Sequence, residues 1–462
     1  MLDPLELAQW AGGVWVGPPP TKPLAGLVHD SRKVRPGFGF IALPGQRMDG
    51  HAFVDDAFRR GADAVIVARP PSSPAGPTLV VADTRTALTH IARGYRATWT
   101  ARIIGVTGSV GKTTTKDLVA HVLAIAGTTG RTIENWNNDI GLPLSLVNTR
   151  RDCRWGVFEV GMNHPGELRT LCDLLGPHWG ILTRVGPVHI EFFADESAIA
   201  DEKATLLKVL PSHGLAILAP DEPWFERLAS QAPCRIVTVA LRPDVGATYV
   251  LTPGPSGLTF TVEGPDGWRC TATAPIPGEP FLRAAVRAAA VGHQAGLTPE
   301  QVTTALHTFQ PPPMRGTRTV VRGVTWVNDA YNANLLSMRS ALDTWAADPI
   351  ARKWVVLGGM RELGTFTEQF HRELGAYAAR GPWAGILWVG ELTRPAMEAA
   401  LAAGWPRDRT WHFPDAQRVA EFLATALRPG DGILLKGSRA EQIERVLELW
   451  NGFGPREDST RG

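Results

Sequence analysis

The stretch from Arg102 to Gly127 combines the residue types that bind phosphate. RIIGV predicts a buried strand, and TGSVG then supplies two glycines and small side chains, so that backbone amides can turn toward an anion. KTTTKDLVAHVLAIAG predicts a helix that begins at Lys112 and stops at Gly127, with an apolar side made of Leu118, Val122, Leu123 and Ile125. Because a helix N-terminus favours negative charge, this order of elements predicts a nucleotide phosphate site.

The loop departs from the usual spacing of a phosphate-binding loop, which has a glycine five residues before the glycine of Gly-Lys-Thr. Val106 occupies that position, one residue after Gly105. The anion-binding groups are still present, because Lys112 can contact the β- and γ-phosphates and Thr113 can offer a hydroxyl to Mg²⁺. The residues expected to contact the nucleotide here are Thr107, Gly108, Ser109, Val110, Gly111, Lys112, Thr113 and Thr114.

A magnesium ion needs more oxygen ligands than one threonine hydroxyl. Glu159 ends the predicted strand WGVFEVG, and parallel sheets bind ligands at the carboxyl ends of their strands. An ordinary strand-end glutamate is the alternative interpretation. The chain carries no Gly-x-Ser-x-Gly turn and no Cys/His motif that would supply a protein nucleophile. These features favour chemistry that depends on holding phosphate and metal.

Around this site the sequence predicts three α/β domains in series. Residues 1–83 carry short apolar strands with one helix between them, and residues 84–311 alternate strands and helices in the manner of a parallel sheet. Residues 248–276 alternate apolar and polar side chains around Gly/Pro turns, which indicates antiparallel hairpins. After the linker QPPPMRG, residues 312–462 repeat the alternating pattern, with a helix expected at AEQIERVLELW and a frayed polar tail at 454–462.

Composition excludes several classes of protein. The chain has 462 residues and a net charge of +2 with dispersed basic residues, so no nucleic-acid or membrane-surface partner is expected. No apolar run approaches the roughly 20 residues that span a bilayer, and the first residues lack the features of a secretory signal. The four cysteines are scattered without pair spacing, which fits a reducing compartment and gives no metal framework. We therefore expect a cytoplasmic protein.

Six motifs occur in the order found in Mur ligases, and the chain resembles this family over nearly its whole length. They are TGSVGKTTTK, ENWNNDIGLP, FEVGMNHPGE, GPVHIEFF with IADEK, VNDAYNAN and LLKGSRAEQIE. The resemblance implies a small N-terminal UDP-binding domain, a central P-loop ATPase-type domain with an antiparallel β extension, and a C-terminal Rossmann-like α/β domain. NWNNDIGLP and NDAYNAN resemble the family member that adds a dipeptide.

The implied activity is an ATP-dependent amide ligase. Such a ligase phosphorylates the terminal carboxylate of UDP-N-acetylmuramoyl-tripeptide, and the amine of D-alanyl-D-alanine then attacks the acyl phosphate. The resemblance also implies a monomer. Another Mur-type ligase with a different amino acceptor is the first alternative. A nucleotide-binding switch that only changes shape is the second, and Glu159, His189 and Lys203 argue against it because a switch needs no acyl-phosphate metal pair.

The resemblance assigns roles in catalysis and metal binding to residues of the central domain. Lys112 would contact the phosphates, Thr113 and Glu159 would hold Mg²⁺, and His189 would help to hold a second metal ion. Lys203 matches a lysine that is carbamylated in the family, since a free ammonium repels Mg²⁺ whereas a carbamate offers carboxylate-like oxygens. A loop histidine and a solvated helix lysine are the alternatives for His189 and Lys203.

The resemblance also assigns contacts with the substrates and with the nucleotide. In the first domain, Ser31 and Arg32 would contact the uridine diphosphate, where a forked guanidinium suits phosphate; a plain polar loop is the alternative. Asn137 and Asn138 would lie near the sugar-peptide, unless they form a simple Asn-rich turn. The residues implied for the nucleotide- and substrate-facing loop of the last domain are Asp329, Tyr331, Asn332 and Asn334.

Arg315, in the linker, resembles an arginine that reaches the ATP phosphates from the C-terminal side. The site would then be completed only when the domains close, which excludes water from an acyl phosphate. An exposed linker charge is the alternative interpretation of Arg315.

Three positions depart from the family pattern. Pro280 and Ala284 stand at the usual His and Asn that contact adenine, Gly359 stands at the Asp of a Gly-Asp-Met motif, and Met314 replaces the Gly of a Gly-Arg pair. The phosphate and metal ligands are kept, so the sequence predicts an active enzyme with altered adenine contacts. Reduced selectivity among nucleoside triphosphates is the hypothesis that follows.

Overall fold

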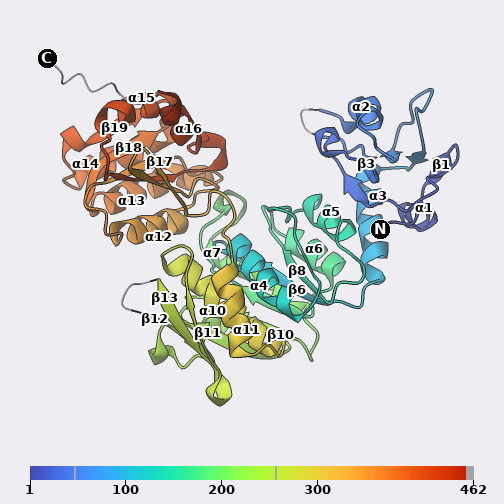
Figure 1. Cartoon of the computed structure of the whole chain (residues 1–462), viewed down its shortest axis with the longest axis horizontal. Coiled ribbons are helices and arrows are strands. Elements are labelled where there is room, and N and C mark those ends of the chain that lie inside the picture. The colour runs from blue at the N-terminus through green and yellow to red at the C-terminus, as the bar shows by residue number, and fades with distance from the viewer. Residues whose placement is uncertain (46–47, 255–257, 454–462) are drawn as a thin grey trace.

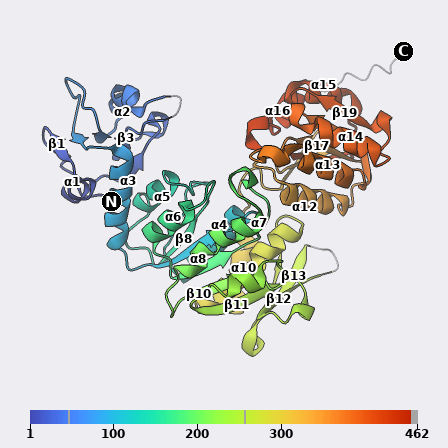
Figure 2. The ribbon, with the colours of Figure 1, turned by 180° about the vertical axis from the view of Figure 1, so that it is seen from behind.

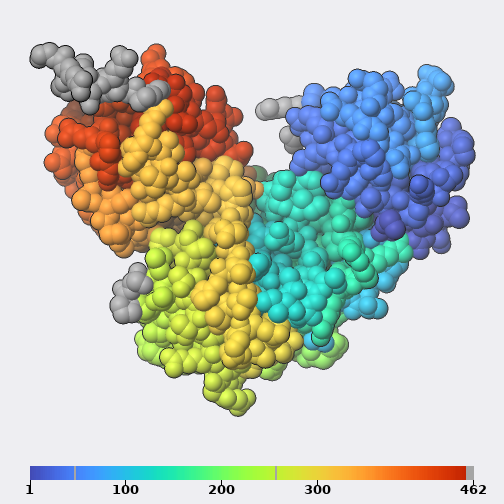
Figure 3. All heavy atoms as spheres, in the orientation of Figure 1, coloured from blue at the N-terminus to red at the C-terminus, as the bar shows by residue number. Residues whose placement is uncertain are grey.

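The structure is a computed structural model that describes residues 1–45, 48–254 and 258–453, and over these residues the chain forms three α/β domains, as the sequence predicts. The tail expected to fray, residues 454–462, lies outside the described residues. Two opposite views show the first and last domains both resting on the central domain and lying apart from each other (Figures 1 and 2). The space-filling view shows a notch between them (Figure 3).

The first domain contains a sheet of strand order β1-β5-β4-β3-β2, in which β2 to β5 run parallel and β1 is antiparallel to β5. The strands are β1 (Val14–Val16), β2 (Gly26–Val28), β3 (Phe38–Ile41), β4 (Ala64–Val67) and β5 (Thr78–Val80). The helices are α1 (Pro4–Ala11) and α2 (Val54–Arg59), and α3 (Thr84–Ala97) leads from this domain into the central one. Helix α3 packs against α1 of this domain and against α5 and α6 of the next.

The central domain is built on a sheet of order β14-β13-β12-β11-β10-β9-β6-β8-β7. Its strands are β6 (Arg102–Thr107), β7 (Thr129–Arg131), β8 (Trp155–Glu159), β9 (Trp179–Leu182), β10 (Leu215–Leu218), β11 (Arg235–Ala240), β12 (Tyr249–Pro253), β13 (Thr259–Glu263) and β14 (Arg269–Thr273). From β7 to β12 neighbouring strands pair in parallel, whereas β12, β13 and β14 pair antiparallel, so the predicted extension is confirmed.

Helices cover both faces of this sheet. They are α4 (Lys112–Ala126), α5 (Gly141–Val147), α6 (Glu167–Leu175), α7 (Glu196–Lys203), α8 (Thr205–Lys208), α9 (Phe225–Ala229), α10 (Glu279–Gln294) and α11 (Pro299–Thr308). Helix α4 packs against α10. Leu118, Val122 and Leu123 are buried as expected, but Ile125 is 40% exposed because it lies beyond this contact, in the last turn.

The last domain has a sheet of order β15-β16-β20-β17-β18-β19, with β15 antiparallel at one edge and the other strands parallel. Its strands are β15 (Thr317–Val321), β16 (Val324–Asn328), β17 (Lys353–Gly358), β18 (Trp383–Val389), β19 (Thr410–Phe413) and β20 (Gly432–Lys436). Its helices are α12 (Leu335–Ala346), α13 (Thr367–Ala378), α14 (Arg394–Ala402), α15 (Ala416–Ala426) and α16 (Arg445–Gly452). The final helix begins later than predicted, because Gln442 adopts a left-handed φ of 51°.

The register of the central sheet decides where functional side chains meet. Strand β6 lies between β8 and β9, with Val106 opposite Glu159 on one side and Thr107 opposite Leu182 on the other. The loop after β6, the end of β8 and the segment after β9 therefore emerge at one edge of the sheet. This is the carboxyl edge, where ligands bind in parallel α/β sheets.

Candidate active site

The two glycines of the phosphate loop are required by its backbone. Gly108 has a φ of 145° and Gly111 a φ of 87°, and both values lie where side chains other than glycine are strained. A Cβ atom at Gly108 would also lie 1.9 Å from the Thr183 hydroxyl oxygen. Val106, at the position where the usual motif has glycine, is a buried residue of β6. The turn therefore depends on Gly108 and Gly111 and needs no glycine at residue 106.

The segment that follows β9 holds the phosphate loop from one side. The backbone N–H of Ser109 donates to the carbonyl of Arg184 at 2.5 Å, and the Ser109 hydroxyl donates to the carbonyl of Gly186 at 2.8 Å. The N–H of Thr183 donates to the carbonyl of Thr107 at 2.8 Å. These bonds hold the start of the loop in one conformation before any ligand binds, so the loop is preorganised for binding.

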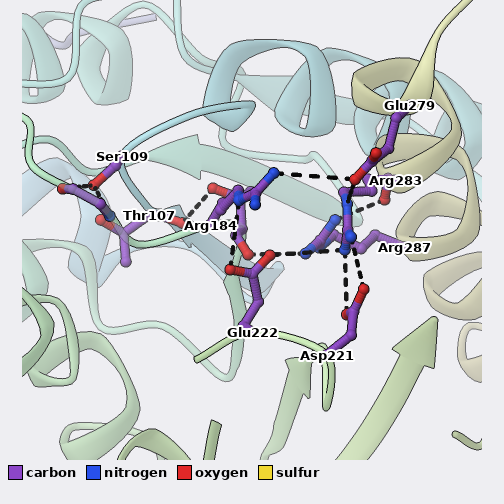
Figure 4. A network of polar contacts seen from close by, with 10 residues as sticks. Thr107, Ser109, Arg184, Asp221, Glu222, Glu279, Arg283 and Arg287 are labelled. Atoms are coloured by element: carbon purple, nitrogen blue, oxygen red, sulfur yellow. Dashed lines mark hydrogen bonds and ion pairs between the residues drawn. The ribbon is translucent and has the colours of Figure 1, made fainter. Parts of the chain in front are cut away.

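A network of charged residues lies behind this segment (Figure 4). Arg287 of α10 is buried and donates 2.8 Å hydrogen bonds to the carbonyls of Thr183 and Arg283. Burial, reinforced by Arg283, lowers the pKa of the Arg287 guanidinium to about 10. The buried carboxylate of Glu222 lies 3.7 Å from both Arg184 and Arg283, and burial raises its pKa. The network thus connects α10 to the backbone that holds the phosphate loop.

Thr113 and Glu159 form the centre of the site. Thr113 lies in the first turn of α4 and donates a 2.9 Å hydrogen bond from its hydroxyl to Oε2 of Glu159, which is buried at the end of β8. The amide of Asn137 donates to Oε1 of the same carboxylate at 2.7 Å. The N–H of Glu159 donates to the hydroxyl of Thr132 at 2.7 Å. Both carboxylate oxygens are therefore oriented.

Lys112, which is half-buried, and Lys203, which is buried, act electrostatically on the same carboxylate. Lys112 donates from Nζ to the carbonyl of Gly108 at 2.8 Å, and burial lowers its pKa although Glu159 acts in the opposite direction. Lys203, at the end of α7, is 2% exposed, and burial together with the nearby Lys112 lowers its pKa well below the ordinary value. Since two cations share one buried anion, the structure favours the neutral amine at Lys203.

His189 lies at the contact between the central and last domains. Its Nδ1 atom is 2.5 Å from Oε2 of Glu362, and this contact lowers the pKa of the Glu362 carboxyl. Both residues have left-handed backbones, with φ of 58° and 62°. Among the described residues, no hydrogen bond or ion pair joins His189 to Thr113 or Glu159. The ring therefore lines the cavity but points toward the last domain.

Arg315 reaches the phosphate loop from the linker. Its Nη2 atom donates to the hydroxyl oxygen of Thr113 at 3.0 Å, and its guanidinium carbon lies 4.1 Å from the centroid of the Tyr331 ring. Met314, just before it, has a left-handed φ of 58°, a conformation that glycine adopts with less strain than methionine. A planar cation on an aromatic face is held in a defined orientation. The last domain thus supplies a cation to the central site.

Lys436, which the sequence motifs did not indicate, organises the loop after β16. This buried lysine donates to the Asp329 carboxylate at 2.7 Å and to the carbonyls of Asp329 and Asn332 at 3.2 Å. A lysine at the end of the otherwise apolar strand GILLK is a signal that could have indicated it. Asn334 caps α12 by accepting from the N–H of Ser337 at 2.9 Å, so its side-chain oxygen has a structural partner.

A cavity of about 500 Å³ joins these groups across the central and last domains. The predicted residues that line it are Gly108, Ser109, Val110, Gly111, Lys112, Thr113, Thr114, Asn137, Glu159, His189, Lys203, Arg315, Asp329, Tyr331, Asn332 and Asn334. Asn135, Asn163, Arg318, Lys436 and Ser438 also line it and were not predicted. Most of the site residues predicted from the sequence therefore line this cavity.

Thr107 and Asn138 lie within the described chain but do not line the cavity. Thr107 is buried and donates from its hydroxyl to the carbonyl of Val160 at 2.9 Å. The side chain of Asn138 accepts from the N–H of Gly141 at 2.8 Å, at the beginning of α5. In this structure both side chains stabilise the backbone around the site.

Ser31 and Arg32, also described, lie in the first domain and outside the cavity. Ser31 is buried, and its hydrogen bond lowers the pKa of the Asp56 carboxyl. Arg32 is exposed and pairs with Asp30 at 2.8 Å. A ligand that contacted both these residues and the phosphate loop would have to extend from the first domain to the central one.

The departures at the adenine positions have physical consequences. Pro280 lines the cavity, whereas Ala284 is 1% exposed and belongs to the core between α10 and the sheet. A Cβ atom at Gly359 would approach Leu392 to 2.9 Å, so an aspartate there would need the backbone or Leu392 to move. The residues at 284 and 359 therefore offer the cavity no side-chain hydrogen-bond donor or acceptor.

No helix in the described part of the chain is long and apolar enough to cross a membrane.

Comparisons with known proteins agree with this architecture. Three family models match in order: the Mur ligase family, catalytic domain (residues 23–96), the Mur ligase middle domain (106–292) and the Mur ligase, glutamate ligase domain (314–439). A UDP-N-acetylmuramoyl-tripeptide–D-alanyl-D-alanine ligase from Bacillus subtilis (strain 168) is 33% identical over 434 residues, 92% of either chain. The protein of that name from Escherichia coli (strain K12) is 32% identical over 431 residues, 92% of this chain and 93% of the other.

Solved structures match over almost the whole length. A crystal structure of MurF from Acinetobacter baumannii has a TM-score of 0.85 at 27% identity, covering 97% of this chain and 99% of that one. A MurF ligase from Thermotoga maritima in complex with ADP has a TM-score of 0.77 at 28% identity, covering 92% and 97%. The phosphate loop, the Thr113–Glu159 pair and these matches together show that the chain belongs to the Mur ligase family.

Proposed function

We propose that this chain is an ATP-dependent amide ligase that joins D-alanyl-D-alanine to UDP-N-acetylmuramoyl-tripeptide and releases ADP and phosphate. The observation that carries the proposal is the hydrogen bond from Arg315 to the hydroxyl of Thr113, which itself donates to Glu159. Groups from two domains therefore lie together at the phosphate loop. The relatives that bear this activity in their names match over more than nine-tenths of the chain. The proposal therefore rests on both the geometry and the family.

The reaction requires two bond exchanges. A carboxylate oxygen of the tripeptide forms a bond to the γ-phosphorus while the bond from that phosphorus to the ADP oxygen breaks. The nitrogen of D-alanyl-D-alanine then bonds to the acyl carbon and loses a proton, and the bond from that carbon to the phosphate oxygen breaks. The protein's task is to position charged groups, and the cavity contains Lys112 and Arg315 for the phosphates.

The donor atoms of the site fit a magnesium ion. The Thr113 hydroxyl and the Glu159 carboxylate are oxygen donors at 2.9 Å from each other, beside a loop suited to phosphate. Mg²⁺ takes many of its ligands from phosphate and water, so two protein oxygen donors beside a phosphate loop are compatible with it. Thr113 and Glu159 would hold one ion, with His189 and Lys203 serving a second. Bound Mg²⁺ would neutralise charge that develops on the phosphates.

Lys203 would contribute to metal binding as a carbamate. The neutral amine that its burial favours is the form that reacts with CO₂: the nitrogen bonds to the carbon of CO₂, one proton is released, and a carbamate anion results. The carbamate is an anion that attracts Mg²⁺, whereas the protonated lysine would repel it. A ¹³C signal from a carbamate is expected in protein equilibrated with ¹³C-bicarbonate, and it should be absent from Lys203→Met.

Residues on two sides of the cavity would hold the substrates. Ser31 and Arg32 would contact the uridine diphosphate, and Asn137 and Asn138 would lie along the sugar-peptide. Asp329, Tyr331, Asn332 and Asn334 would complete the nucleotide and acceptor side once the domains close. A notch separates the first and last domains (Figure 3), and a substrate that contacts both the first domain and the cavity would have to extend between them.

The decisive experiment is phosphate release from ATP with UDP-N-acetylmuramoyl-tripeptide, with and without D-alanyl-D-alanine. Turnover that requires both substrates is the expected result. Turnover with single amino acids in place of the dipeptide would favour a Mur-type ligase with another acceptor. Hydrolysis that is indifferent to both substrates would favour a nucleotide-driven switch.

A further inference from the structure

Lys116 is a buried lysine of α4 that no step of the proposed reaction uses. It is 1% exposed and lies one helical turn beyond Lys112. Its Nζ atom donates to the carbonyl of Thr132 at 3.2 Å and to the carbonyl of Glu134 at 3.0 Å, and it lies 2.8 Å from Oδ1 of Asp117. A buried ammonium persists when its donors are satisfied in this way. Lys116 therefore ties the helix of the phosphate loop to residues 132–134.

The backbone that Lys116 holds is strained. Glu134 has a φ of 49°, a left-handed conformation that is costly for a glutamate. Such conformations persist where the surroundings over-determine them. The hydrogen bond from Lys116 to the carbonyl of Glu134 is one such constraint. The side chain of Glu134 is largely exposed, so the constraint acts on the backbone.

The segment from residue 132 to residue 138, here termed the bridging loop, contacts Glu159, the carboxylate proposed to bind Mg²⁺. The hydroxyl of Thr132 accepts from the N–H of Glu159, and the amide of Asn137 donates to its carboxylate at 2.7 Å. The carbonyl of Asn137 also accepts from the N–H of Gly161 at 2.9 Å. The orientation of Glu159 therefore depends on the position of this loop.

Another part of the bridging loop contacts the first domain. Lys33 lies 3.2 Å from the Glu134 carboxylate and 4.8 Å from the centroid of the Trp136 ring. His29 packs edge-on against Trp136, with ring centroids 5.7 Å apart. Lys33 directly follows Arg32, in the segment for which we propose contact with the uridine diphosphate. The loop thus lies between the proposed substrate segment and Glu159.

We propose that Lys116 is a positioning residue that holds the bridging loop in its strained conformation and so couples binding of the UDP-linked peptide to the orientation of Glu159. This inference rests on the proposed function. The structural reason is that Trp136 and Asn137 both follow the left-handed turn at Glu134, so loss of that turn displaces both contacts together. The phosphate loop does not depend on this turn, because residues 183–186 hold it.

The test compares Lys116→Met with Arg131→Met. Methionine keeps most of the length of the side chain but removes the donors to both carbonyls. Arg131 is an exposed cation 3.2 Å from the same Asp117 oxygen, so its removal controls for loss of a charge beside that carboxylate. Steady-state kinetics with ATP, UDP-N-acetylmuramoyl-tripeptide and D-alanyl-D-alanine give the three KM values and kcat, and calorimetry gives the Kd for ADP.

Lys116→Met is expected to raise KM for the UDP-linked peptide about tenfold or more and to lower kcat, while the Kd for ADP changes less than about twofold. Amide exchange should accelerate at residues 133–138 and stay unchanged in the core of α4. Arg131→Met should match wild type. Adding Glu134→Gly to Lys116→Met should recover part of the lost peptide affinity, since glycine adopts the left-handed conformation without strain.

Equal losses for ADP and the peptide, or unchanged exchange in residues 133–138, would overturn the inference, because Lys116 would then only stabilise α4. The exchange measurement needs no turnover. Wild-type protein that fails to use both substrates would therefore refute the proposed function, while the exchange data still report on whether Lys116 holds the loop.

Discussion

The hydroxyl of Thr113 donates to Oε2 of Glu159 at 2.9 Å, and the same hydroxyl oxygen accepts from Nη2 of Arg315 at 3.0 Å. Arg315 is separated from Thr113 by 202 residues in the sequence. One hydroxyl therefore connects the phosphate-loop helix, the end of β8 and the linker to the last domain. A change at any of the three residues is expected to alter how the cavity holds phosphate and metal.

Replacing Glu159 with glutamine tests the metal site. Glutamine keeps the size of the side chain and an oxygen that can accept from Thr113, and the Asn137 amide can turn to accept from the new NH₂ group. The negative charge is lost, so kcat is expected to fall roughly a hundredfold or more, because metal-based charge stabilisation supplies several kcal/mol. Phosphate release measured over a Mg²⁺ titration checks this. A variant with wild-type kcat and Mg²⁺ dependence would remove Glu159 from the metal site.

Replacing Arg315 with lysine separates charge from shape. Lysine retains the positive charge but loses the planar group that lies over Tyr331 and the fork that reaches Thr113. We expect kcat/KM for ATP to fall about tenfold or more in Arg315→Lys and further in Arg315→Ala. Arg352→Lys, in the same domain, pairs with Asp431 at 2.6 Å outside the cavity and is the matched control. Full activity of Arg315→Lys would indicate that a point charge is sufficient.

Pro280 and Ala284, at the positions implied for adenine contact, predict weak selectivity among nucleoside triphosphates. Ala284 is buried and Pro280 offers the cavity no side-chain donor, so kcat/KM for GTP or CTP should lie within about tenfold of that for ATP. Ala284→Asn should not restore selectivity, because the amide would enter the core and cost about 1–3 kcal/mol of unfolding free energy. Competition between triphosphates and urea denaturation measure the two effects. A marked preference of the wild type for ATP would contradict the hypothesis.

Titration of the buried His371 is expected to make the free energy of unfolding depend on pH. This buried histidine of α13 lies with Nδ1 2.7 Å from the carbonyl of Thr367, and its Nε2 accepts from the N–H of Met360 at 3.0 Å. Burial lowers its pKa, although the Thr367 carbonyl and Glu441 act in the opposite direction. The neutral ring fits these partners, whereas a protonated ring could not accept from Met360.

Because the folded-state pKa of His371 lies below the unfolded value near 6.5, the unfolded chain binds more protons as pH falls below about 6.5. The free energy of unfolding should therefore decrease from about pH 7 toward pH 5. His371→Gln keeps one donor and one acceptor without titrating, so its unfolding free energy should fall less over this range. Urea unfolding of both proteins at several pH values measures the difference, and identical pH profiles would exclude His371 as a source.

The buried hydrogen bonds of Arg287, beside the phosphate loop, are expected to contribute to the free energy of unfolding. Arg287→Met would leave the carbonyls of Thr183 and Arg283 without this donor and should cost about 2–4 kcal/mol of unfolding free energy. It should also raise KM for ATP, because Thr183 holds the loop. Arg227→Met, at an exposed pair with Asp201, is the control and should cost less than about 1 kcal/mol. Equal losses of unfolding free energy in the two variants would show that buried Arg287 contributes no more to stability than exposed Arg227.

The sequence by itself determined the local parts of this protein. The strand before the phosphate loop, the glycines at 108 and 111, and the helix from Lys112 follow from hydrophobic pattern and backbone preference, which act over a few residues. The antiparallel strands near residues 248–276 follow from period-two alternation in the same way. The end of the predicted strand WGVFEVG indicated Glu159, and motif resemblance then indicated Lys203 and Arg315.

Only the tertiary structure decided which distant groups meet. Lys436 and Asp329 are 107 residues apart, and Arg287 lies 104 residues from the carbonyl of Thr183 to which it donates. The pairing of His189 with Glu362 likewise depends on how the last domain packs on the central one. No local pattern encodes such contacts, because they follow from the strand order of the sheets and the docking of domains. Most of the site residues that the sequence named line the cavity, and the fold assigned their partners.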